Sequence, residues 1–331
     1  KLIAKIELLC KAPKTGSGEF LEKFKRLKAS LVYCPKPKEV SPMAKDNSKY
    51  LKFIDKALEL CKDIPRYFSK FSNKIFCNHQ KLILLVLKQK LRTTYRDLVE
   101  LLKISDIPLY IGLRRIPHHS TLVKFAKKIK PKMLNLLLPH SEAKVVGIDG
   151  TGFEVENRSM HYQMRTNLHS YRRYVKLGIS ADLDKQIILK NEIHKSPRND
   201  IKDFMPLVKG IKTKFVCADK GYDSNKNHQF VIQTLNAKSL IAVKDYGGKR
   251  RNWRKDWRKY AKKHFDEKEY HQRSKVESIF SSVKRKYGSC LKARTFAAQK
   301  KEVICKLIAY NIDRIINFYL LFLGVSAKPL S

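Results

Sequence analysis

Two short apolar runs that each end in an acid constrain the fold of this chain more than any other feature. The first, KVVGIDG, covers residues 144–150, and the second, KFVCADKG, covers residues 214–221. Uninterrupted apolar runs of this length predict buried strands, and the glycines that follow predict turns. We therefore expect Asp149 and Asp219 at strand ends, where carboxylates from different strands can converge. Taken singly, each Asp could equally be a turn residue that bonds its own backbone.

The segments around these runs alternate between strand and helix patterns. Residues 171–183 and 185–196 predict two antiparallel strands joined by a short turn. Residues 199–211 predict an amphipathic helix, capped by Asn199 or Asp200. The pattern is completed by a helix at 225–236, a strand at 238–245 and a helix from 270 onward. The chain is therefore predicted to contain a mixed α/β unit.

Four polar residues in the segment YHQRSKVESIFSSVKRKYG, residues 270–288, share one face of this last predicted helix. At 100° per residue, Tyr270, Arg273, Glu277 and Lys284 fall within a sector of roughly 60°. A single carboxylate among cations is typical of an ion-pair face. Such a face would also suit an acid that holds a metal ion beside phosphate-binding cations, if other acids lie close to it.

The three acids and their neighbours match a known signature. Around the third acid the spacing is Tyr, two residues, Arg, three residues, Glu, six residues, Lys. In this the chain resembles the DDE transposases of bacterial and archaeal insertion sequences, in particular the group of insertion-sequence families four and five. The phrase ADKGYDS after the second strand is also similar to the family's second-aspartate segment. The resemblance covers roughly residues 140 to 320.

The resemblance implies an α/β fold with a ribonuclease H-like mixed sheet flanked by helices, preceded by an all-α N-terminal region. In such a fold the first and fourth strands are neighbours, and the signature helix lies across them. Asp149, Asp219 and Glu277 would then be the catalytic residues and the metal ligands. They would hold two Mg²⁺ ions about 3.5 to 4 Å apart, with Mn²⁺ as a substitute.

The resemblance also assigns roles to the cations of the signature. Tyr270, Arg273 and Lys284 would bind DNA phosphates near the cleaved bond. The alternative is that Arg273 and Lys284 only neutralise Glu277 or an adjacent acid. Two further acids, Asp200 and Asp223, are predicted as a helix cap and a turn residue, outside the metal site.

The function implied is that of a transposase, an enzyme that binds the ends of an insertion sequence, cleaves the DNA and joins the 3′ ends to target DNA. Its partners would be double-stranded DNA, as terminal inverted repeats and target, and a second copy of the chain in a homodimer. Two alternatives stay open. One is a DNA-binding relic or domesticated protein that no longer transposes, and the other is a different metal-dependent nuclease or resolvase of this fold.

The chain is predicted to divide into four parts. The helical pattern of the second part suits DNA binding, although a plain helical bundle with a basic face would look the same. The predicted parts are a Lys-rich helical region at 1–80, a helical, DNA-binding region at 81–140, the catalytic domain at 141–320 and a tail at 321–331.

A basic segment at 246–269 interrupts the catalytic domain before the signature helix. It holds both tryptophans of the chain, Trp253 and Trp257, among nine Lys and Arg residues from position 249 to 263. Aromatic residues interleaved with cations suit base stacking and phosphate binding. Since both tryptophans and Tyr260 recur at helical spacing, they could instead pack inward.

The charge of the chain points independently to nucleic acid. There are 71 Lys and Arg residues against 30 Asp and Glu, a net charge of +41, which calls for a polyanionic partner. The apolar content of 43% excludes a merely basic tail and indicates one or two substantial cores.

Cysteine spacing and the apolar segments predict the compartment. The seven cysteines form no CxxC pair, which is typical of free thiols in a reducing cytoplasm. No signal peptide is recognisable, and the apolar run at 315–325 is too short to cross a membrane. We expect a cytoplasmic, nucleoid-associated protein of a prokaryote with no membrane partner.

Overall fold

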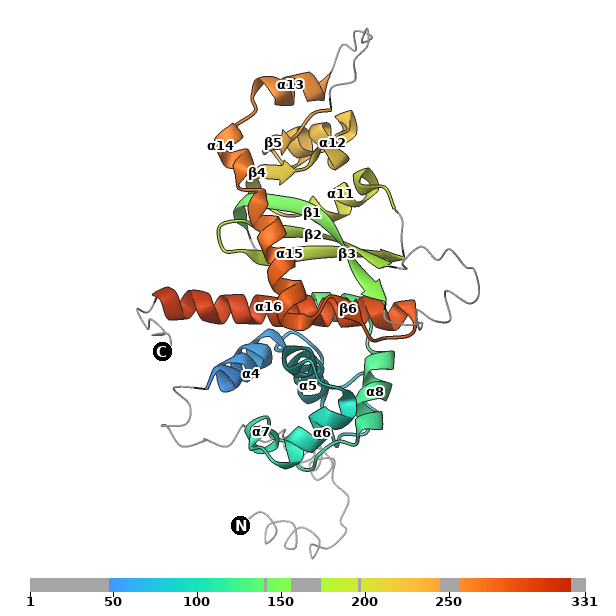
Figure 1. The fold of residues 1–331 in the computed structure, drawn as a ribbon. Helices are drawn as coiled ribbons and strands as arrows, with labels where there is room; N and C mark the ends of the chain where they lie inside the picture. Colours follow the sequence, from blue (N-terminus) through green and yellow to red (C-terminus); the bar gives the residue numbers. More distant parts are fainter. Residues whose placement is uncertain (1–47, 140–141, 156–173, 196–197, 245–255, 323–331) are drawn as a thin grey trace, which may run out of the picture.

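A six-stranded mixed sheet forms the centre of the computed structural model (Figure 1). The structure describes residues 48–139, 142–155, 174–195, 198–244 and 256–322. The strands are β1 (Ala143–Val155), β2 (Tyr174–Asp182), β3 (Ile187–Lys195), β4 (Thr213–Ala218), β5 (Lys238–Ile241) and β6 (Cys290–Leu291).

The strand order is β3-β2-β1-β4-β5, and β6 pairs with the far end of β1. The first three strands are antiparallel, whereas β4 is parallel to both β1 and β5. Along the chain, three strands are followed by helix, strand, helix, strand and helix, as the sequence predicts. The predicted ribonuclease H-like arrangement is thereby confirmed.

Helices cover both faces of this sheet. On one face α11 (Asp200–Val208) packs with Val146 and Ile148 of β1. On the other face α15 (Ser274–Tyr287) lies against β1 so closely that a Cβ on Gly147 would come within 2.5 Å of Val276. A glycine is therefore required for this helix to cross the strand.

Side-chain caps begin two of the helices. The hydroxyl of Thr94 accepts a hydrogen bond from the Asp97 amide and caps α6 (Tyr95–Lys103), and the Asp97 carboxylate accepts one from the Thr94 amide. Asn199, one of the two expected residues, caps α11.

Between β4 and β5 the chain forms α12 (Asn225–Gln229) and continues as a π-helical turn, η2 (Phe230–Thr234). The helix expected at 225–236 is thus present but widened at its end. Its Val231 belongs to the same core as Phe204 of α11.

A second layer of helices precedes the sheet. It consists of α4 (Lys49–Leu60), α5 (Asn78–Leu91), α6, α7 (Ile107–Tyr110), α8 (His119–Lys128) and α9 (Pro131–Asn135). Figure 1 shows the long helix α16 (Phe296–Phe322) between these helices and the sheet.

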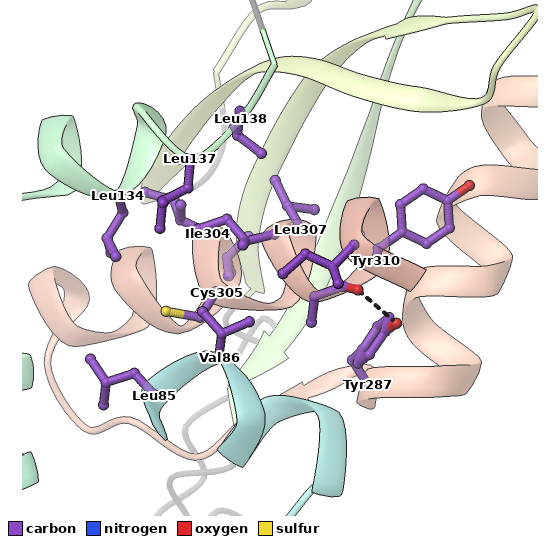
Figure 2. Close-up of a cluster of buried hydrophobic side chains, with 14 of the residues drawn as sticks. Leu85, Val86, Leu134, Leu137, Leu138, Tyr287, Ile304, Cys305, Leu307 and Tyr310 are labelled. Atoms are coloured by element: carbon purple, nitrogen blue, oxygen red, sulfur yellow. Dashed lines mark hydrogen bonds between the residues drawn. The ribbon is translucent and has the colours of Figure 1, made fainter. Parts of the chain in front are cut away.

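The two faces of α16 join both layers into one core (Figure 2). Leu85 and Val86 of α5 and Leu134 of α9 pack against Ile304 and Leu307 of α16. The apolar run that begins at residue 315 continues α16, but Ile315 and Ile316 are only half-buried and Phe318 is exposed. Within the described residues, none of the helices combines the length and apolar character needed to cross a membrane.

Candidate active site at the ends of β1 and β4

Asp149 lies in β1, and Asp219 directly follows the neighbouring parallel strand β4. Ile148 of β1 is in register with Ala218, the last residue of β4, so in both segments the next residue is an acid. The predicted turn after Asp149 is wrong, because β1 continues to Val155. Although β4 ends here, β2 continues to pair with β1, and Gly150 lies opposite Gly178.

The signature around Glu277 is divided between two helices, not carried by one as predicted. Tyr270 belongs to α14 (Glu267–His271), and Arg273 precedes the first residue of α15. The amide of Arg273 donates to the carbonyl of Tyr270 at 2.9 Å, and the amide of Val276 donates to that of Arg273 at 2.9 Å. These bonds span only three residues and tighten the chain at the junction of the two helices.

Arg273 brings the acids of the site together. Its Nη2 lies 3.0 Å from Oε1 of Glu277, and its Nη1 lies 3.9 Å from Oδ2 of Asp149. The Asp149 side chain is 22% exposed and that of Glu277 is 58% exposed, so the group opens to solvent on the helix side. In the structure Arg273 therefore neutralises neighbouring acids, as the alternative interpretation of the sequence expects.

Three negatively charged side chains, Asp149, Asp219 and Glu277, lie close enough to interact electrostatically. Burial raises the pKa of Asp149, and the negative charges of Asp219 and Glu277 raise it further. The Gly150 amide, which donates to Oδ1 of Asp149 at 2.8 Å, and Arg273 lower that pKa, but the net shift is upward. The raised pKa means that the positive charge near Asp149 does not fully compensate for its burial and for the neighbouring acids.

The three acids suit a hard divalent cation by their chemistry, since Mg²⁺ prefers carboxylate oxygens. Asp219 and Glu277 are close enough to Asp149 for their negative charges to raise its pKa. Among the described residues, however, no three His, Cys, Asp or Glu side chains are arranged to hold an ion. Here Arg273 supplies the positive charge that the acids share.

Lys284 lies farther along α15 and faces β1. Its Nζ donates to Oγ1 of Thr151 at 2.7 Å and lies 5.7 Å from the centre of the Phe153 ring. Within the described part of the chain it makes no ion pair, so the neutralising role considered for this lysine does not apply here.

Asp200 is a fourth acid at the site, which the sequence interpretation assigned only to a cap. Its carboxylate lies 3.6 Å from a Cβ built on Gly150 and 3.3 Å from one built on Gly221. Lys176 of β2 forms an ion pair with it. The signal that could have located it is its place at the first turn of the helix between the third and fourth strands.

Asp223 is not the simple turn residue that the sequence predicts. Its side chain is fully buried and accepts hydrogen bonds from Arg258 and from the Lys244 amide at 2.7 Å. His228 lies 3.2 Å away. Burial raises the pKa of Asp223, but these hydrogen bonds together bring it below its usual range.

The ion pair between Asp223 and Arg258 holds α13 (Trp257–Lys263) in place. This helix lies in the described part of the basic segment. Trp257 is half-buried, and its ring meets that of Tyr260 edge to face at 6.2 Å. Its amide donates to Asn225 at 2.8 Å. The other tryptophan, Trp253, lies outside the described residues.

Two of three comparisons with known proteins found a similarity. A family model described as "Transposase DDE domain" matches residues 140–312, just over half of the chain. Among solved structures, a piggyBac transposase synaptic complex with hairpin DNA is similar, with a TM-score of 0.42 and 11% identity, over 85% of this chain and 75% of that chain. No curated protein matches the sequence. The family model identifies the chain as a member of the DDE transposase family.

Proposed function

We propose that Asp149, Asp219 and Glu277 are the catalytic acids of this transposase and that they bind Mg²⁺. Enzymes of the family cleave DNA and transfer strands with the help of divalent metal ions. The observation that carries the assignment is the grouping of the acids about Arg273, at the edge where β1 and β4 lie side by side. A divalent cation bound there would stabilise charge on the attacking and leaving oxygens.

The reaction has two steps of the same kind. Water attacks a phosphodiester at the element's end, the bond from phosphorus to the 3′ oxygen breaks, and a 3′-hydroxyl is released. That hydroxyl then attacks a phosphodiester of target DNA, forming one new bond to phosphorus and breaking one. Only the nucleophile differs between the steps.

Arg273 has two roles in this proposal. In the structure its guanidinium balances Asp149 and Glu277. When other positive charge balances these acids, the planar guanidinium is free to donate to the non-bridging oxygens of a phosphate. Tyr270 lies beside it and would contact the same phosphate group, while Lys284 would bind the next part of the strand.

The regions outside the site are proposed to bind DNA as well. The helical region at 81–140 would contact the element's terminal repeats. Trp257 would stack on a base exposed at the cleaved end, and Trp253 would do the same. Two ends must be joined to one target, so we propose a homodimer on DNA, acting where the element's DNA lies, in a prokaryotic nucleoid.

The test is cleavage and joining of labelled DNA that carries the element's own ends, with Mg²⁺ or with EDTA. We expect Mg²⁺-dependent joining by the parent and none by Glu277→Gln. Glu267→Gln is the matched control, because Glu267 is an exposed glutamate on the adjacent helix α14. Tight, salt-sensitive binding without cutting by the parent would instead show a DNA-binding relic.

A further inference from the structure

A cationic cavity lies at the end of α15 away from the acids. Its volume is about 330 Å³, and it is enclosed by the end of α5, the end of α15, β6 and α16. One carboxylate, Glu302, faces it. The cations that line it are Lys88, Arg92, Lys292 and Lys306.

The single acid of the cavity is already engaged. The two oxygens of Glu302 accept hydrogen bonds from the backbone amides of Lys292 at 3.2 Å and Ala293 at 3.0 Å. Within the described residues, neither Arg92 nor the Lys292 side chain forms an ion pair. The cavity therefore has more positive charge than its own acid balances.

Two of the cations converge on one glycine. The buried ammonium of Lys306 donates to the carbonyls of Gly288 at 2.8 Å and Cys290 at 2.9 Å. A Cβ built on Gly288 would lie 3.5 Å from Nη2 of Arg92 and 3.7 Å from Nζ of Lys306. Burial and the nearby charges of Lys88 and Arg92 lower the pKa of Lys306 to about 8. Like charges held together in this way favour an anion between them.

The backbone at this corner is also unusual. Arg92 ends α5 with φ of 55°, in the left-handed region where glycine or asparagine is favoured. An arginine in this conformation suggests a role for its side chain. Beside it, the hydroxyl of Thr93 lines the cavity and is buried without a hydrogen-bond partner in the described part of the chain. Within the described residues, the Thr93 hydroxyl thus lacks a hydrogen-bond partner and lies in the same cavity as Arg92 and Lys292, which form no ion pair.

Two lysines, Lys284 of α15 and Lys306 of the cavity, lie near the same aromatic ring, that of Phe153. Nζ of Lys284 and Nζ of Lys306 lie 5.7 Å and 5.4 Å from the centre of the Phe153 ring. Glu277 and Gly288 are separated along α15 by about 16 Å at the helical rise of 1.5 Å per residue. With 3.4 Å between nucleotides of one DNA strand, this distance corresponds to about five nucleotides.

We propose that this cavity binds a backbone phosphate of the DNA, about five nucleotides from the phosphate that reacts. The ligand is a phosphodiester, recognised by charge and by the Thr93 hydroxyl, and independent of base sequence. The walls of the cavity come from α5 as well as from α15 and α16. A phosphate bound there would therefore contact the helical layer and the catalytic domain at once, so that both bind the same DNA strand. The inference rests on the proposed function, because it needs DNA along α15.

Arg92→Gly is the sharpest test, since glycine accepts the positive φ and the side chain with its guanidinium is removed without backbone strain. Lys292→Gln is a second variant, at an exposed side chain. Lys185→Gln is the matched control, because Lys185 is exposed in the turn between β2 and β3, at the other end of the sheet. Binding of a labelled duplex is measured against salt concentration. We expect the slope of log affinity against log salt to fall by about one for each cavity variant and to stay unchanged for the control.

A duplex series with one phosphate at a time replaced by a neutral methylphosphonate locates the contact. The parent should lose affinity at a linkage about five nucleotides from the cleavage site, and Arg92→Gly should be insensitive at that linkage. Unchanged slopes, or equal changes in the control, would overturn the cavity assignment. Failure of the parent to cut its own ends, with these binding results retained, would count against the proposed function and leave the phosphate site standing.

Discussion

Two sets of carboxylates lie near the same edge of the sheet and are built in opposite ways. In the first, Asp149 and Glu277 share one guanidinium, that of Arg273, and the group opens to solvent. In the second, Asp223 is fully buried and accepts hydrogen bonds from Arg258 and from the Lys244 amide. Both sets combine an acid with an arginine, so residue type does not distinguish them.

The difference appears in the pKa values. Burial and neighbouring acids raise the pKa of Asp149, whereas hydrogen bonds overcome the effect of burial and lower that of Asp223. A carboxylate whose pKa is lowered has its charge satisfied by the fold. A carboxylate whose pKa is raised lacks positive charge that a ligand can supply. We therefore assign the first set to catalysis and the second to stability.

The largest expected effect is on catalysis by the first set. Asp149→Asn, Asp219→Asn and Glu277→Gln should each reduce strand cleavage by about 10³-fold or more, because each removes a proposed metal ligand. DNA binding and the unfolding midpoint should stay close to the parent's. Cleavage assays and binding titrations on the same preparations check this, with Asp184→Asn, in an exposed turn, as control. A variant that still cuts at the parent's rate is not part of the metal site.

The second set should show the reverse behaviour. Asp223→Asn removes the buried negative charge that pairs with Arg258, so the free energy of unfolding should fall by about 3 kcal/mol. Urea unfolding of the variant and of Asp184→Asn measures the loss. A change no larger than the control's would show that the ion pair does not stabilise the fold.

The two sets should also respond oppositely to pH. The raised pKa of Asp149 means that its contribution to stability is full below the ordinary value of 3.8 and is lost as pH rises through the raised value. The lowered pKa of Asp223 means that its contribution is present above 3.8 and is lost as pH falls through the lowered value. The parent's stability relative to Asp149→Asn should thus decrease with pH, and relative to Asp223→Asn it should increase. Unfolding curves across the acidic range decide this, and slopes of equal sign would contradict it.

Asp200 lies beside the first set and gives the smallest expected effect. It is paired with Lys176 but is 41% exposed, so Asp200→Asn should change stability by less than about 1 kcal/mol. Its carboxylate faces the glycines beside Asp149 and Asp219, so we expect cleavage to fall by about tenfold. Single-turnover cleavage compares it with Asp184→Asn. Parental rates with reduced stability would place Asp200 in the structural set.

Much of the fold followed from local patterns. The strands around 144–149 and 214–218, the hairpin of β2 and β3, and the Asn199 cap were all predicted, since they depend on residues close in sequence. The predicted end of β1 was wrong because its continuation depends on pairing with β2 beyond Asp149. The single signature helix was wrong because the turn at Arg273 is tightened by local hydrogen bonds that spacing alone does not reveal.

The order of the elements, the basic character of the chain and the acids of the family signature can all be predicted from the residues in order. What each charge does depends on the folded arrangement. The tertiary structure placed Arg273 between Asp149 and Glu277, brought Asp200 beside them, buried Asp223 against Arg258, and gathered Arg92 and Lys306 around Gly288. The physical reason is that an ionic contact depends on burial and on partners distant in the chain, whereas strand and helix patterns depend on neighbours.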